Sequence, residues 1–214
     1  MKQQITLWIK RLLLLLAGLT IAHLGVTLFL QSDLGSDPFN VFIQGLQRCI
    51  AAALPFITHG WVHVGISFLI ILVLLAADRS YIRIGTLLCM ILGGPIIDAF
   101  TFLLQDVIHA GSSLPWRIAC LALGCVILAF GMTIVIKSEA GTGPNDLVAV
   151  VISDKAKKKF GVIRIIVDVG FAVIGFLLGG TIGAGTVICA FLVGPTAQLF
   201  FPISEKICTG ILKK

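Results

Sequence analysis

Long apolar runs without charge dominate the hydropathy pattern of this 214-residue chain. A helix that crosses a membrane needs about 20 mostly apolar residues. Six segments approach or reach that length: about Leu12 to Leu30, Gly60 to Ala77, Ile84 to Leu104, Pro115 to Ile136, Phe160 to Leu178 and Ala184 to Ile203. The last two belong to one run, which we divide at the glycine-rich segment 179–185 because clustered glycines favour turns. The pattern predicts an all-α, polytopic membrane protein with six transmembrane helices.

Two shorter segments, Pro38 to Leu54 and Pro144 to Asp154, are also predicted to be helical. Each begins with proline, which is favoured at the first position of a helix because its fixed φ suits the helix and its missing N–H is not needed there. Neither segment carries an apolar run long enough to span a bilayer. We expect both to be short helices that are re-entrant or lie at the membrane interface.

Composition supports a membrane location and limits the function. The chain is 58% hydrophobic and 12% charged, whereas about a quarter of the residues of soluble globular proteins are charged. Six spans leave no room for a soluble catalytic domain, and no Ser/His/Asp or paired-carboxylate set can be assembled, so we do not expect an enzyme. The six cysteines contain no Cys-x-x-Cys pair, and we expect neither a metal site nor a cofactor.

The distribution of the 16 Lys and Arg residues predicts the topology. With six spans and a cytoplasmic N-terminus, all of them except Arg48 and Arg117 lie in cytoplasmic segments or at the cytoplasmic ends of spans. This asymmetry follows the positive-inside rule. We therefore expect both termini in the cytoplasm. We assign the net charge of +6 to membrane orientation and expect no nucleic-acid partner.

The chain contains an internal duplication. Residues 32–40 and 138–146 share the pattern S-[DE]-x-G-[ST]-x-P-x-[ND], and residues 85–95 and 185–195 share Gly, Thr, Cys, Gly and Pro at matching positions. Each half contains three predicted spans, which is an odd number, so the second half enters the membrane from the opposite side. We therefore expect a single transmembrane domain, 1–214, built as two inverted repeats of about 5–108 and 112–212.

The repeated motif provides the candidate substrate-binding residues. Asp37 and Gly143 stand at the predicted N-cap positions, so each short helix can present unpaired backbone N–H groups and the positive end of its dipole to an anion or a polar solute. In the alternative, Ser36 and Thr142 only cap these helices and no ligand is involved. The candidates are Ser32, Asp33, Gly35, Ser36, Asp37, Asn40, Ser138, Glu139, Gly141, Thr142, Asn145 and Asp146.

A second group of candidates consists of polar residues within the spans. Asp98 and Gln198 each follow a helix proline by three residues, and an ionisable group in the hydrocarbon region is expensive enough to suggest a function. His23 lies in the middle of the first span, and Arg164 and Asp168 are four residues apart on one helix face, where they can pair. We expect all five along a pathway. The alternatives are a hydrogen-bonded kink, a packed histidine and a structural ion pair.

The repeated motif with its short helix, together with the Gly-Thr and Gly-Pro pairs of the third and last spans, resembles the YczE/YyaS/YitT-like family of bacterial integral membrane proteins. The resemblance covers nearly the whole chain. One difference is the segment Asp37-Pro38-Phe39-Asn40, where the family is expected to carry a Gly-Pro-Trp-Asp type of sequence. The family is largely uncharacterised, so the resemblance implies a multi-pass protein of the bacterial cytoplasmic (inner) membrane and little about its substrate.

Two functions are consistent with this sequence. The first is a transporter or channel for a small solute, with a pathway between the two inverted repeats. The alternative is a membrane scaffold or regulatory subunit that binds a partner protein through the Pro38 to Leu54 helix or the basic segment 154–159. The expected partners are the lipid bilayer, an unknown small solute and, if the chain assembles into a homo-oligomer, further copies of itself.

Overall fold

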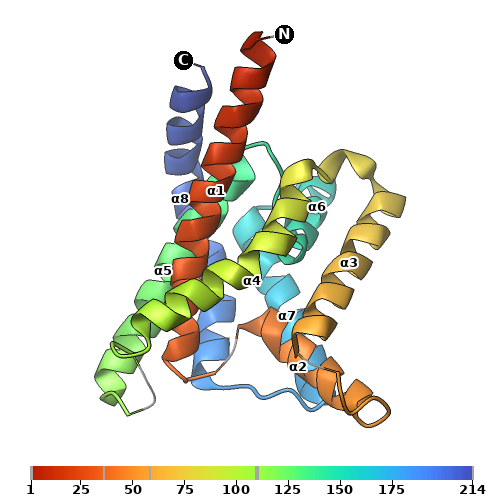
Figure 1. Cartoon of the computed structure of the whole chain (residues 1–214), viewed down its shortest axis with the longest axis vertical. Coiled ribbons are helices and arrows are strands. Elements are labelled where there is room, and N and C mark those ends of the chain that lie inside the picture. Colours follow the sequence, from red (N-terminus) through yellow and green to blue (C-terminus); the bar gives the residue numbers. More distant parts are fainter. Residues whose placement is uncertain (1, 36, 58, 109–110, 214) are drawn as a thin grey trace.

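The computed structural model is all-helical (Figure 1). It describes residues 2–35, 37–57, 59–108 and 111–213, without the side chains of residues 2, 3, 30, 59, 60 and 98. The α-helices of these residues are α1 (Lys2–Gln31), α2 (Pro38–Ala51), α3 (His59–Ala77), α4 (Ile84–Leu104), α5 (Leu114–Lys137), α6 (Pro144–Ala156), α7 (Phe160–Leu177) and α8 (Ala184–Leu212), and a short 3-10 helix, η1 (Arg79–Tyr81), precedes α4. The predicted all-α class is confirmed.

Five of the described helices, α1, α4, α5, α7 and α8, are long and apolar enough to cross a membrane. The apolar part of α3 that is described, Trp61–Ala77, is shorter. The helices expose many large apolar side chains, among them Trp61, Phe102 and Leu199, and an apolar surface of this extent suits lipid rather than water. The prediction of a polytopic protein in contact with the lipid bilayer is confirmed, whereas the sixth span stays a prediction.

The helix boundaries agree with the sequence pattern at the motif and extend beyond it at the chain ends. α2 and α6 begin at the predicted prolines, and the glycine-rich segment 179–185 separates α7 from α8. Gly179, with φ of +91°, adopts a backbone conformation that other residues rarely tolerate. α8 continues to Leu212, well past Ile203, because the charged residues after Ile203 end the apolar run without ending the helix.

α1 and α5 are antiparallel and pack closely at the centre of the fold (Figure 1). Four glycines, Gly18 and Gly25 of α1 and Gly124 and Gly131 of α5, let the two backbones touch. A Cβ atom added at Gly25 would lie 2.3 Å from the backbone nitrogen of Leu128, and one at Gly131 would lie 2.2 Å from a backbone nitrogen of α1. Both distances are too short for real atoms, so this helix contact requires glycine.

The starts of α4 and α8 each pack on a motif turn of the other half of the chain. The Gly85 N–H donates to the Ala140 carbonyl at 2.9 Å, and the Gly185 N–H donates to the Leu34 carbonyl at 2.8 Å. In addition, α2 contacts α7, and α3 contacts α6. The two halves are therefore interleaved, and both chain ends lie at the same end of the molecule (Figure 1).

Candidate functional site

The two motif turns share their backbone conformation and their long-range contacts. Asp33 and Glu139 have left-handed φ values of +50° and +59°, and the glycines two positions later have φ values of +132° and +140°. Arg117 Nη2 lies 3.4 Å from Asp33 Oδ2, and Arg11 Nη2 lies 2.5 Å from Glu139 Oε2. The acidic residue of each motif is thus paired with an arginine from the other half of the chain. Sequence reasoning missed these arginines, although their separation of 106 residues is that of the duplicated motif.

The starts of α2 and α6 differ in how their backbone N–H groups are satisfied. At α2, the Asp37 carboxylate accepts the backbone N–H of Asn40 at 3.2 Å and its side-chain amide at 2.5 Å. At α6, the N-cap residue is Gly143, which has no side chain to act as an acceptor. The backbone N–H groups of Asn145 and Asp146 find no acceptor among the residues that the structure describes. The predicted N-cap positions are confirmed, but only α2 has a side-chain cap.

Thr142 lies just before the start of α6 with its hydroxyl unused. The residue is 4% exposed, and the hydroxyl has no hydrogen-bond partner within the described part of the chain. The alternative in which Thr142 caps α6 is therefore wrong, and Ser36 lies outside the described residues. The hydroxyl of Thr86, at the start of α4, is likewise buried and unpartnered among the described residues. By contrast, the hydroxyls of Ser32 and Ser138 each donate to a carbonyl three residues earlier at 2.6 Å.

A buried network of charges connects α6 with α7. Arg164 Nε donates to Asp168 Oδ2 at 2.9 Å, and Arg164 Nη1 donates to Asp146 Oδ1. Arg164 is 8% exposed and Asp168 is 1% exposed. The predicted pairing of Arg164 with Asp168 is confirmed. Asp146 links this pair to the second motif, and the one guanidinium therefore faces two carboxylates.

The other polar candidates within the spans make hydrogen bonds of their own. His23 Nδ1 lies 2.8 Å from the Leu19 carbonyl, one helical turn earlier. Gln198 Oε1 accepts the backbone N–H of Gly161 at 3.2 Å, near the start of α7. The side chain of Asp98 lies outside the described residues. A pathway that includes all of the predicted residues therefore stays a prediction.

A cavity of about 420 Å³ lies at the second motif. Residues of η1, of α6 and of the segment between α5 and α6 surround it. Its lining consists of Ser80, Tyr81, Arg83, Ile136, Glu139, Gly141, Thr142, Leu147, Val150 and Asp154. At its rim, loss of hydration raises the pKa of the Tyr81 hydroxyl, and the hydrogen-bonded Asp154 carboxylate raises it further. The unpartnered Thr142 is thus part of a cavity wall.

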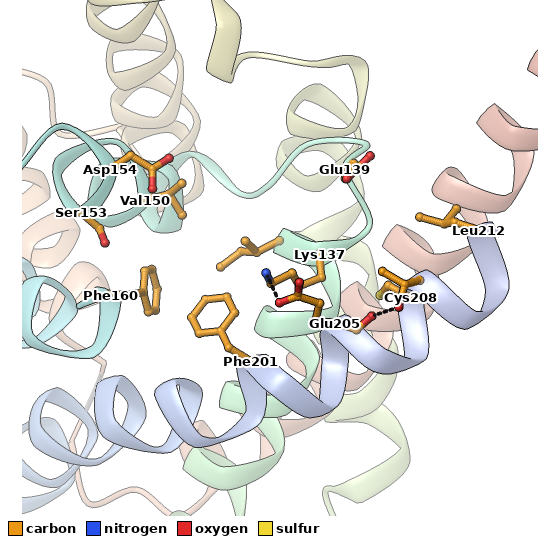
Figure 2. A pocket seen from close by; sticks show the side chains of 12 residues that line it. Lys137, Glu139, Val150, Ser153, Asp154, Phe160, Phe201, Glu205, Cys208 and Leu212 are labelled. Atoms are coloured by element: carbon orange, nitrogen blue, oxygen red, sulfur yellow. Dashed lines mark hydrogen bonds and ion pairs between the residues drawn. The ribbon is translucent and has the colours of Figure 1, made fainter. Parts of the chain in front are cut away.

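An adjoining cavity of about 360 Å³ shares four lining residues with the first, namely Ile136, Glu139, Val150 and Asp154. Figure 2 shows the rings of Phe160 and Phe201 turned toward each other in this cavity, with their centroids 5.1 Å apart. Lys137 Nζ lies 2.7 Å from Glu205 Oε2 on the same wall. We call the two cavities together the vestibule. Polar and apolar side chains share its walls, which include Thr142, just before the start of α6.

The sequence has relatives among bacterial proteins. Residues 9–202 match a family described as "Family of unknown function (DUF6198)". The chain belongs to this family. The uncharacterized protein YyaS of Bacillus subtilis (strain 168) is 28% identical over 189 residues, which cover 88% of this chain and 91% of YyaS. The uncharacterized membrane protein YczE of the same organism is 29% identical over 205 residues, which cover 95% of this chain and 90% of YczE.

An uncharacterized protein of Haemophilus influenzae is 30% identical over 198 residues, which cover 92% of this chain and 86% of that protein. No solved structure matches the chain. These relatives confirm the resemblance to YczE and YyaS over most of the length. The DUF6198 chain is thus a multi-pass integral membrane protein with bacterial relatives.

Proposed function

We propose that this protein moves a small solute across the bacterial cytoplasmic membrane, as a transporter or channel, along a route between two inverted repeats. The observation that carries the proposal is the position of the vestibule. It lies beside the start of α6, where the network of Asp146, Arg164 and Asp168 begins. Buried charges close to a cavity suit a protein that carries a polar solute through an apolar layer.

Matched contacts support the inverted repeats. The Gly85 to Ala140 and Gly185 to Leu34 hydrogen bonds join corresponding positions of the duplicated sequence, and each links one half to the other. α1 runs opposite to α5, and α4 runs opposite to α8 (Figure 1). A two-fold relation about an axis in the membrane plane produces both features. On this proposal α3 is the sixth span, and α2 and α6 are re-entrant.

The positions of the cations support a vestibule that opens to the cytoplasm. Its lining includes residues of η1 and of the C-terminal part of α8, two segments that lie toward the end of the molecule that holds both termini (Figure 1). The lysines that follow α6, Lys157, Lys158 and Lys159, adjoin the same end, as does Arg83 before α4. The positive-inside rule assigns an end rich in lysine and arginine to the cytoplasm.

The composition of the buried network favours a functional over a purely structural role. Taking each ion out of water costs several kcal/mol, on the order of the whole gain from pairing. A structural pair needs only Arg164 and Asp168. The additional carboxylate of Asp146 leaves an excess of negative charge that a bound proton can offset, and ionisable groups of this kind are typical of membrane pathways.

Flux measurements on the protein reconstituted in liposomes test the proposal. Pools of amino acids, carboxylates, sugars, amines and inorganic ions are applied to the wild type, to Asp168→Asn and to Asp106→Asn. Asp168→Asn removes a charge from the buried network, whereas the matched control removes an exposed carboxylate after α4. We expect flux of at least one pool in the wild type, a strong reduction in Asp168→Asn and no change in Asp106→Asn. No flux from any pool, together with a co-purifying partner protein, would instead favour a scaffold.

A further inference from the structure

We propose that the start of α6, beside the vestibule, binds an oxyanion group of the transported solute, either a carboxylate or a phosphate-type group. The inference rests on the proposed transport function and names the class of solute. It is supported by a helix N-terminus without a side-chain cap, by the buried Thr142 hydroxyl, which has no partner in the described part of the chain, and by a cavity that Thr142 lines.

The first half of the chain shows which kind of group suits such a helix start. The Asp37 carboxylate caps α2 and accepts the Asn40 N–H at 3.2 Å. At the corresponding position of α6, Gly143 offers no acceptor, and the amides of Asn145 and Asp146 have none among the described residues. Free amides at the positive end of a helix dipole favour an anionic oxygen. A carboxylate of the solute can therefore occupy at α6 the place that Asp37 has at α2.

Thr142 is an independent indication of a ligand. The residue lines the cavity and is almost fully buried, and its hydroxyl lacks a partner among the described residues. A buried hydroxyl without a hydrogen bond costs free energy, which a bound acceptor would recover. Thr86 adds a second hydroxyl of this kind, on a segment in backbone contact with Gly141. Three donors at the start of α6, the Thr142 hydroxyl and the amides of Asn145 and Asp146, thus have no acceptor among the described residues.

Charged residues of both signs surround the cavity, and ion pairs offset part of the negative charge. Asp146, in the first turn of α6, is bound by Arg164 through Oδ1. Arg83 lines the cavity together with Glu139 and Asp154, and one of its nitrogens donates to the Glu139 carbonyl, while the Glu139 carboxylate pairs with Arg11. A volume of about 420 Å³ lies within the usual range of small-molecule sites.

Thermal unfolding of the purified full-length protein in detergent tests this site. Sodium acetate, phosphate and sulfate are each titrated against sodium chloride at equal ionic strength, and a short-chain phosphatidic acid forms a separate arm. We expect the melting temperature of the wild type to rise saturably with at least one soluble oxyanion and not with chloride, because a ligand that binds only the folded state stabilises it.

Three variants test whether the rise in melting temperature comes from an anion bound at the start of α6. Gly143→Asp places a carboxylate at the N-cap, so we expect a higher melting temperature without anion and no further rise with it. Thr142→Val removes the unpartnered hydroxyl, so we expect unchanged stability without anion and roughly tenfold weaker anion binding, the effect of one lost hydrogen bond. The matched control Gly210→Asp adds a carboxylate at an exposed glycine of α8 with open space around it, and its response should equal that of the wild type.

Three results would overturn the inference: no saturable response in the wild type, an undiminished response in Gly143→Asp, or a response to phosphatidic acid without one to any soluble anion. The outcome is separable from that of the transport proposal. Flux in liposomes without anion binding would contradict the anion site but not the transport proposal. Anion binding at α6 without flux of any pool would contradict the transport proposal but not the anion site.

Discussion

The motif segments 32–40 and 138–146 fold in the same way but begin different helices. In each, a left-handed residue and a glycine with positive φ flank a carbonyl that accepts the N–H of a glycine in the other half. At the helix start that follows, Asp37 caps α2, whereas Gly143 leaves α6 without a side-chain cap. The shared contacts are those that the fold needs. The contacts that only one segment makes are those on which the proposed anion site depends.

The same contrast separates α3 from α7. His63 and Ser67 correspond to Arg164 and Asp168 at a spacing of 101 residues. His63 packs edge-on against Phe39, with ring centroids 5.4 Å apart, while Arg164 binds two carboxylates. The second half therefore has a buried ion network where the first half has an aromatic contact.

The largest expected effect comes from breaking this network. Arg164→Gln leaves Asp146 and Asp168 buried without their cation, and we expect it to lower the free energy of unfolding by about 3–5 kcal/mol. His63→Gln, at the corresponding position, loses the aromatic contact with Phe39, and we expect a cost of about 1 kcal/mol. Unfolding by SDS in mixed micelles measures both. Equal losses would show that the two halves do not differ in this respect.

The glycines at the crossing of α1 and α5 should behave alike in the two halves. Gly25→Ala and Gly131→Ala each force the helices apart, and overpacking of this kind costs about 1–3 kcal/mol. Gly65→Ala in α3, where a Cβ atom meets open space, should be neutral or slightly stabilising. The same SDS unfolding experiment compares them. A variant at either crossing glycine that is as stable as Gly65→Ala would contradict the close contact.

The corresponding threonines of α4 and α8 should respond differently. The Thr186 hydroxyl accepts the Gly183 N–H at 3.2 Å, so Thr186→Val should lower the free energy of unfolding by about 1 kcal/mol. The Thr86 hydroxyl has no partner among the described residues, so Thr86→Val should be neutral or stabilising. Melting temperatures in detergent without added anion report the difference. Equal destabilisation would show that Thr86 has a structural role.

The carboxylates of the motif turns should matter least. Asp33 and Glu139 pair with Arg117 and Arg11, but their side chains are 70% and 56% exposed. Exposed pairs contribute about 0–1 kcal/mol and are weakened by salt. Asp33→Asn and Glu139→Gln should therefore change the melting temperature slightly and to a similar extent, and less at high salt. A large effect of only one of these two substitutions would show that the two motif turns are not equivalent.

Local patterns predicted those parts of the site that depend on neighbours in the chain. Pro38 and Pro144 marked the helix starts because proline suits the first helical position. Arg164 and Asp168 could be paired from sequence because a helix brings residues four apart onto one face. The contact of Arg164 with Asp146 could not, since it depends on how α6 packs against α7.

The unused hydroxyl of Thr142 was also beyond sequence reasoning, which left ligand binding and helix capping as alternatives. Whether a hydroxyl next to a helix start finds a partner depends on the turn before it and on the helix packed against it, here α4. Neither is encoded in the local pattern. The duplication did contain one unused signal, because Arg11 and Arg117 repeat at the motif spacing and form the corresponding ion pairs.

Labelling of single cysteines tests the inverted arrangement of the two halves most directly. Asp33→Cys and Glu139→Cys place thiols at exposed, corresponding positions, in a Cys49→Ser background because Cys49 is itself exposed. A membrane-impermeant maleimide is applied to spheroplasts and to inside-out vesicles. We predict that Asp33→Cys reacts only in spheroplasts and Glu139→Cys only in inside-out vesicles. Reaction of both from the same face would contradict inverted repeats and the solute route proposed between them.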